Sequence, residues 1–282
     1  YRLPGNVKVL SLGKENKKLL NCYIVKLLYC WRFYKYIFKY KNDYGGVFVH
    51  MNPEYCILGG IFWRLWHKKV LLWYTHKAVN WRLRLAEKLV NKIFTASKES
   101  FRLKSKKVEV VGHGIQVEAF AEQPENIPVG QLCLLSVGRD SPSKDFETAV
   151  KAVKLLEEKK NLLPIKFVIE SSRRHDEMPT VYHDCHVLIH TSRTGSMDKV
   201  VLEAMASGRI VITSSEAYAD LAKQGLVYAF PAGNYQELAK TIEKIYNSGI
   251  IKQIPIQAAI EYVRQNHSID TLMSRVTVYF SV

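Results

Sequence analysis

The sequence predicts an α/β protein with two domains, each built around a parallel sheet. Short β-branched and apolar runs alternate with amphipathic stretches along the 282 residues, which is typical of parallel strands joined by helical crossovers. Charge divides the chain as well. Residues 1–128 carry 23 Lys and Arg against 9 Asp and Glu, whereas the rest carries 18 against 17. A net charge of +14 beside +1, with all five tryptophans on the basic side, indicates two domains, the first of which meets an anionic partner.

The first part of the chain is expected to hold one sheet of short strands. Strands are predicted at residues 7–12, 46–50, 69–74, 92–96 and 108–111, and helices at about 17–40, 56–67 and 81–91, with a short helix from Ser97. Residues 112–114 and the segment 121–130, which contains Pro124, Pro128 and Gly130, are predicted to form a linker because glycine and proline interrupt regular structure.

The second part is expected to hold the other sheet. Strands are predicted at residues 132–137, 165–169, 185–191, 210–213 and 227–230, and helices at 178–184, 197–205, 217–223, 235–247 and 255–265, with a further helix ending near Lys159. Ser268 is predicted to cap a last helix, with Asp270 in its first turn.

Residues 192–208, SRTGSMDKVVLEAMASG, are expected to form the centre of the site. A buried strand precedes a polar turn (Arg193, Thr194, Gly195 and Ser196), and a helix follows with one apolar stripe. Its members are Met197, Val200, Val201, Ala204 and Met205, and Gly208 is expected to end the helix in the left-handed conformation. A glycine turn at a helix N-terminus suits a phosphate, because the first N–H groups lack partners.

Lys199 and Glu203 are four residues apart and are expected to share a ridge off the buried stripe. The Glu203 carboxylate would then suit the ribose hydroxyls of a nucleotide diphosphate. An ordinary strand–turn–helix unit with a surface Lys–Glu pair explains the same spacing equally well.

Three further residues follow predicted strands at the edge where parallel sheets bind ligands. Arg139 and Lys144, in the loop GRDSPSK, could hold a diphosphate, although a solvated loop is the simpler interpretation. His76 could orient a sugar or an acceptor hydroxyl, and a structural histidine is the alternative.

Residues 31–40 and 61–69 mix aromatic side chains with Lys and Arg. Basic amphipathic helices of this kind lie on anionic membrane surfaces, and a core helix with a basic solvent face is the alternative. The sequence shows no known nucleic-acid-binding motif and no apolar run long enough to span a bilayer, and we expect no secretory leader. Its five scattered cysteines argue against a disulfide framework or a zinc site and favour a reducing compartment.

Four segments together resemble the family-4 glycosyltransferases of the GT-B fold. They are FTASKES and VVGHGIQVEAF in the first part, and LLSVGRDSPSKDFETAVKAV and MPTVYHDCHVLIHTSRTGSMDKVVLEAMASGRIVITS in the second. The resemblance covers nearly the whole chain. It implies two Rossmann-like domains with parallel sheets, both somewhat reduced, and an active site in the cleft between them.

The resemblance also implies roles for particular residues. Arg139 and Lys144 would hold the donor diphosphate, Glu203 the nucleotide ribose, and His76 would lie near the transferred sugar. The donor site would be completed by Gly195, Ser196, Met197, Asp198, Lys199 and Val200, largely through backbone N–H groups. The implied reaction is a retaining, metal-independent transfer of a hexosyl group from a nucleotide sugar, with no cofactor.

Three departures from the family pattern are visible. Gly195 stands where the family usually carries the first of two glutamates, a change shared by members that have TGSxDKVxLEA. The usual first strand and its glycine-rich loop do not precede Tyr1, and only eight residues separate Ile169 from Met178. We therefore expect a fragment or a shortened member of the family.

The expected domains are an acceptor-side domain (1–125), a nucleotide-sugar-binding domain (126–265) and a closing helix (266–282) that packs back towards the first. The leading hypothesis is a cytoplasmic glycosyltransferase, peripheral on the inner face of the membrane. It would act on a lipid-linked or polysaccharide acceptor in surface polysaccharide assembly. The competing hypothesis is a catalytically degenerate protein that only binds a partner or a membrane, with a nucleic-acid-binding module a distant third.

Overall fold

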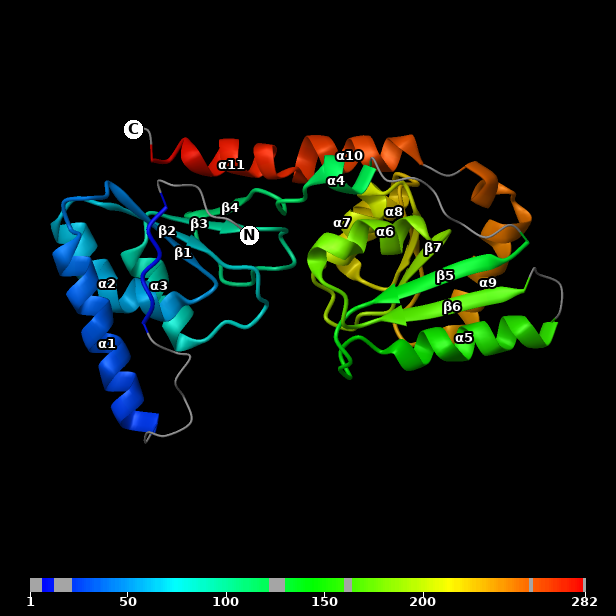
Figure 1. Cartoon of the computed structure of the whole chain (residues 1–282), viewed down its shortest axis with the longest axis horizontal. Coiled ribbons are helices and arrows are strands. Elements are labelled where there is room, and N and C mark those ends of the chain that lie inside the picture. Colours follow the sequence, from blue (N-terminus) through cyan, green and yellow to red (C-terminus); the bar gives the residue numbers. More distant parts are fainter. Residues whose placement is uncertain (1–6, 13–21, 122–129, 160–163, 254–255, 281–282) are drawn as a thin grey trace. The chain divides into compact units, whose positions relative to one another are not determined.

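The protein has an α/β architecture with two sheets, as the sequence predicts (Figure 1). This computed structural model describes residues 7–12, 22–121, 130–159, 164–253 and 256–280. The chain forms two compact units: Tyr1–Tyr74 with Asn80–Ile93, and Thr75–Val79 with Phe94–Val282. The expected domain boundary at residue 125 lies outside the described residues.

The first sheet has four strands in the order β1-β2-β3-β4. They are β1 (Gly46–His50), β2 (Lys69–Trp73), β3 (Lys92–Thr95) and β4 (Val108–Val110). β1 and β2 are parallel, with Gly46 opposite Lys69. Val70, Leu71 and Leu72 of β2 are fully buried, as expected for a strand covered on both faces. The helices in this part of the chain are α1 (Cys22–Lys39), α2 (Pro53–Leu65), α3 (Trp81–Leu89) and α4 (Val117–Ala121).

The second sheet has five parallel strands in the order β6-β5-β7-β8-β9. They are β5 (Leu132–Val137), β6 (Ile165–Glu170), β7 (Val187–His190), β8 (Ile210–Thr213) and β9 (Tyr228–Ala229). The helices are α5 (Phe146–Lys159), α6 (Met178–His183), α7 (Lys199–Ala206), α8 (Ala219–Lys223), α9 (Tyr235–Asn247), α10 (Gln257–His267) and α11 (Ile269–Thr277). Short 3₁₀ turns occupy His175–Glu177, Glu216–Tyr218 and Ile250–Gln253.

Alternate residues of the central strands of the second sheet point to opposite sides, and each side packs against helices. Leu132 and Leu134 of β5 pack in one core with α5 and α9. Cys133 and Leu135 pack in the other core with α6, α7 and α10. The central strands therefore read as continuous apolar runs, and their carboxyl ends emerge together at one edge of the sheet.

Two expected elements in the first part are wrong. Residues 7–12 form no strand. Ser97 begins a turn and not a helix: the Ser100 N–H donates to both the carbonyl and the hydroxyl of Ser97, and the hydroxyl competes with helical pairing. The start of the expected helix at residues 17–21 and most of the expected linker lie outside the described residues.

The C-terminal helix is capped as the sequence predicts. The Ser268 hydroxyl accepts from the Thr271 N–H at 3.1 Å. In the last turn of the helix, Arg275 donates to the carbonyl of Val111. After the helix, the ring of Tyr279 packs edge-on against Phe94 of β3. Among the described helices, none has the length and apolarity that a membrane span requires.

Candidate functional site

Three loops meet at the carboxyl edge of the second sheet. They follow β5, β7 and β8 and comprise residues 138–145, 191–198 and 214–216. The hydroxyl of Thr191 donates to the Lys144 carbonyl at 2.6 Å, and the hydroxyl of Ser215 donates to the Ser196 carbonyl at 2.9 Å. The loop that carries Lys144 and the turn that carries Gly195 are thus held next to each other, as the strand order predicts.

A buried network of charged side chains joins two of these loops. Lys144 Nζ lies 2.5 Å from Asp198 Oδ2, and the same oxygen lies 3.0 Å from His190 Nε2. His190 in turn contacts the Thr213 hydroxyl at 2.9 Å. Burial alone would raise the pKa of the Asp198 carboxyl, but its hydrogen bond and charge contact with His190, together with Lys144, hold that pKa well below its usual range. Asp198 is therefore an anion, and Lys144 remains partly exposed beside it.

The N-terminus of α7 lies directly after this network. Asp198 is the N-cap residue of α7, but its carboxylate bonds Lys144 and His190 and makes no capping bond. Tyr218 fixes the same residue from the other side by donating to the Asp198 carbonyl at 2.5 Å. The first N–H groups of the helix are thus not satisfied by their own N-cap side chain, which is the condition for binding an anion there. Gly208 ends the helix with a φ of 67°, as predicted.

Glu203 lies on α7 but is not on an exposed ridge. Its side chain is 7% exposed, and Oε2 accepts a 2.9 Å hydrogen bond from the Tyr182 hydroxyl. Burial raises the pKa of the Glu203 carboxyl, against the opposing effects of Tyr182, His175 and Lys199. Oε1 faces His175, whose Nδ1 lies 3.9 Å away at the surface. The expected surface Lys–Glu ridge is wrong because Tyr182 of α6 covers this side of the helix, and Lys199 instead donates to the Gly114 carbonyl.

The remaining predicted residues occupy the same loops or their neighbours. Arg139 is exposed just after β5 and pairs with no residue of the described chain. Met197 and Val200 are partly buried against the core, so their side chains are structural and only their backbone could reach a ligand. His76 is exposed, and its Nδ1 accepts from the Ala78 N–H at 3.0 Å.

Sequence reasoning missed three histidines around this edge. His190 ends β7, His175 stands beside Glu203, and His113 Nε2 contacts the Met197 carbonyl at 2.8 Å. Only His190 had a local signal, as the last polar residue of a buried strand. The other two act through tertiary neighbours that spacing does not show.

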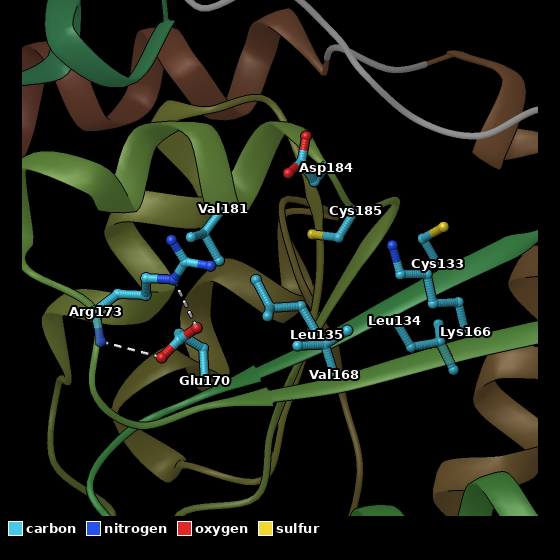
Figure 2. Close-up of a pocket in the computed structure, with 10 residues that line it drawn as sticks. All are labelled: Cys133, Leu134, Leu135, Lys166, Val168, Glu170, Arg173, Val181, Asp184 and Cys185. Carbon is cyan, nitrogen blue, oxygen red and sulfur yellow. Dashed lines mark hydrogen bonds and ion pairs between the residues drawn. The ribbon is translucent and has the colours of Figure 1, made fainter.

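A separate cavity of about 240 Å³ lies between β5, β6 and α6 (Figure 2). Glu170 at the end of β6 binds the backbone N–H and the guanidinium of Arg173 there, and Asp184 lies on the opposite wall. The cavity contains none of the predicted donor residues. Val168, which lines it, is 38% exposed. Within the described part of the chain, no group of three His, Cys, Asp or Glu side chains is placed to hold a metal ion.

Comparison with known proteins agrees with this geometry. Residues 102–248, just over half of the chain, match the family described as glycosyl transferases group 1. The chain belongs to this family.

Solved structures with the same fold are glycosyltransferases of the GT-B type. HepE of Anabaena, solved with UDP and also with UDP-glucose, has a TM-score of 0.71 at 16% identity in the UDP complex, over 89% of this chain and 82% of that one. Sucrose-phosphate synthase from Thermosynechococcus elongatus has a TM-score of 0.71 at 16% identity, over 92% and 78%. The lipopolysaccharide outer core galactosyltransferase WaaB has a TM-score of 0.62 at 12% identity, over 92% and 81%. A comparison with curated proteins finds no significant match.

Proposed function

We propose that the protein transfers a hexosyl group from a nucleotide-diphosphate sugar to a lipid-linked or polysaccharide acceptor, with retention of anomeric configuration and without a metal or other cofactor. The observation that carries this proposal is the Lys144–Asp198 pair beside the uncapped N-terminus of α7. HepE of the same fold has been solved with UDP and with UDP-glucose, which supports a nucleotide sugar as the donor.

The donor diphosphate would lie against α7. The N–H groups from Ser196 to Val200 and the dipole of the helix attract it, and Lys144 supplies a charge from the facing loop. Arg139, which has no partner in the described chain, can turn its guanidinium towards the same anion. Lys144 is neutralised by Asp198 before the donor binds, so the diphosphate would have to share or displace that contact.

Glu203 would bind the nucleotide ribose through Oε1, since Tyr182 occupies Oε2. His76 would orient the transferred sugar or the acceptor hydroxyl. In the reaction the bond from the anomeric carbon to the diphosphate breaks, and its electron pair leaves on the diphosphate. The acceptor oxygen forms the new bond on the same face of the sugar, and its proton passes to the departing diphosphate oxygen. Fixed positive groups lower the barrier by stabilising the departing charge.

The acceptor would be recruited at an anionic membrane by α1 and α2. Leu27, Trp31 and Phe38 share one face of α1 and are 70%, 60% and 45% exposed. Ile61 and Leu65 of α2 are also largely exposed. Between residues 22 and 69 the chain carries eight Lys and Arg against two Asp and Glu, so an exposed apolar face is combined with positive charge. A peripheral, cytoplasmic enzyme on the inner membrane face accounts for this surface.

The transfer is tested by incubating the full chain with a panel of UDP-, GDP- and ADP-sugars and vesicles that contain bacterial lipid extract. We expect release of the nucleoside diphosphate for one donor class, unchanged by EDTA. Activity that EDTA abolishes and that magnesium or manganese restores would contradict the metal-free mechanism. Binding of a nucleoside diphosphate without any turnover would favour the competing proposal of a degenerate, non-catalytic protein.

A further inference from the structure

Gly195 leaves a space that an ion pair from two other loops fills. The residue has a φ of 61°, in the left-handed region that side chains disfavour. A Cβ atom on it would lie 2.6 Å from Lys77 Nζ and 2.7 Å from Glu216 Oε1, closer than real Cβ contacts allow. Lys77 donates to Glu216 Oε1 at 2.8 Å. A side chain at position 195 would therefore push aside the ends of Lys77 and Glu216 where they meet.

The pair lies at the same sheet edge as the proposed diphosphate site. Glu216 lies in the loop after β8, next to Ser215, whose hydroxyl donates to the carbonyl of Ser196. Lys77 is the chain neighbour of His76. The turn from Gly195 to Asp198 thus has Lys144 at one end and Glu216 at the other.

Glu216 presents a carboxylate oxygen to solvent. Its side chain is 66% exposed, whereas that of Lys77 is 18% exposed. Within the described chain, Oε1 takes the bond from Lys77 and Oε2 bonds nothing. The hydrogen bond and charge of Lys77 lower the pKa of Glu216, so the group is ionised at neutral pH. An ionised carboxylate with an open oxygen is a strong acceptor for sugar hydroxyls.

Lys77 also offsets the negative charge of Glu216. A bare carboxylate close to a diphosphate would repel it, but the ammonium group 2.8 Å from Oε1 offsets that charge. The carboxylate of Glu216 thus reaches the space beside Gly195 from another loop.

We propose that Glu216 is a sugar-binding residue of the donor site, whose Oε2 accepts hydrogen bonds from hydroxyls of the transferred sugar, and that Lys77 positions it. This proposal rests on the function proposed above, because it assumes that a nucleotide sugar binds along the turn from Gly195 to Asp198. The ligand is the glycosyl part of the donor and not its nucleotide.

The test compares affinities of the full chain for a nucleotide sugar and for the matching nucleoside diphosphate, such as UDP-glucose and UDP or GDP-mannose and GDP. We expect Glu216→Gln to weaken binding of the nucleotide sugar about 10- to 100-fold, the scale of a hydrogen bond to a charged acceptor, with the nucleoside diphosphate unaffected. Asp220→Asn, an exposed carboxylate in the following helix, is the matched control and should change neither affinity.

A charge swap, Lys77→Glu with Glu216→Lys, separates recognition from a merely structural ion pair. If the pair only ties the two loops together, the swapped protein regains the wild-type affinity for the nucleotide sugar, and our proposal is overturned. Equal losses of both affinities in Glu216→Gln would overturn it as well, while the proposed function would stand. If the wild type binds no nucleotide sugar and no nucleoside diphosphate, the proposed function and this inference both fail.

Discussion

Glu203 combines burial with a hydrogen bond from Tyr182, so its carboxylate is held in one position before any ligand arrives. Such fixed acceptors discriminate strongly, because a ligand that lacks the matching hydroxyl leaves a desolvated carboxylate oxygen without a partner. Under the proposed function, the remaining oxygen, Oε1, would accept from a ribose hydroxyl. Recognition of the ribose would then depend on this one side chain.

At this residue we predict the effect of Glu203→Gln. The amide can still accept from Tyr182, but a ribose hydroxyl loses its charged acceptor, so a nucleoside diphosphate should bind about 10- to 100-fold more weakly. The wild type should also prefer the nucleoside diphosphate over its 2′,3′-dideoxy counterpart, and the variant should not. Calorimetric titration measures both. An unchanged preference in the variant would remove Glu203 from the ribose site.

At the scale of elements, residues 112–114 and α10 meet through two buried histidines, His113 and His267. The His113 N–H donates to His267 Nδ1 at 3.2 Å, and His113 Nε2 lies 2.8 Å from the Met197 carbonyl. The pKa of each ring is lowered to about 4, and burial is the largest cause. At His113 the charge of Lys199 adds to this effect and the hydrogen bond to Met197 opposes it, whereas His113 and Arg275 add to it at His267. Both rings are therefore neutral at pH 7.

These histidines predict how stability depends on pH. The unfolded chain protonates them below about pH 6.5, whereas the folded chain resists protonation until about pH 4. The unfolded state binds more protons in this window, so the free energy of unfolding should fall as the pH drops from about 6.5 to 4, by at most about 3 kcal/mol for each ring.

Thermal unfolding of the full chain at pH 7, 5.5 and 4.5 measures this dependence. His267→Gln should flatten it, because the amide oxygen can accept from His113 without titrating. The exposed His50→Gln is the control and should leave the slope unchanged. An equally steep fall in His267→Gln would show that other groups cause the loss.

Elements whose signal is local could be predicted from the sequence. The strands at 132–137 and 210–213 and the helix at 235–247 have the predicted bounds, because apolar β-branched runs and a clean helical stripe need no tertiary information. Residues 7–12 have a suitable alternating pattern, yet they form no strand. A sequence pattern shows what a segment can bury, and only the folded chain shows whether a partner strand is present.

The candidate site divides in the same way. Lys144 and the turn at Gly195 could be placed at one sheet edge because parallel strands share that edge. The pairing of Asp198 with both Lys144 and His190 could not be predicted, since it joins side chains 8 to 54 residues apart. The burial of Glu203 by α6 could not be predicted for the same reason. The sequence could thus locate the site, whereas only the three-dimensional contacts show which of its charges are paired.

The exposed face of α1 predicts selective binding to anionic membranes. Trp31 is 60% exposed, and Lys35 Nζ lies 5.3 Å from the centre of its ring. We expect Trp31→Ser to reduce co-sedimentation with vesicles that contain phosphatidylglycerol several-fold, because tryptophan settles at the bilayer interface.

Trp81→Ser is the matched control, since Trp81 is 66% exposed but lies on α3. It should bind as the wild type does. Binding should weaken as salt rises through a few tenths molar, because the Debye length shrinks to a few ångströms. Equal binding to phosphatidylcholine vesicles, or equal loss in both variants, would contradict an anionic contact through α1.

For the whole molecule, membership of the glycosyl transferases group 1 family and the GT-B fold define what the chain is, and the loops at the second sheet define what it can hold. Arg139, Lys144 and the start of α7 bring positive potential to one edge, where β5 and β7 end. In the first unit, α1 and α2 bring positive charge and exposed apolar side chains to a surface of another kind. Diphosphate binding is the step on which the proposed transfer and the proposed roles of Glu203 and Glu216 depend.

The most direct test of that step is calorimetric titration of UDP, GDP and ADP into the wild type and two lysine variants. Lys144→Ala should weaken binding of the preferred nucleoside diphosphate by roughly 1.5–3 kcal/mol, the scale of a charge-assisted hydrogen bond. Lys154→Ala, which removes an exposed lysine from the following helix, should bind as the wild type does. Wild-type affinity in Lys144→Ala, or an equal loss in both variants, would contradict a diphosphate site at this edge.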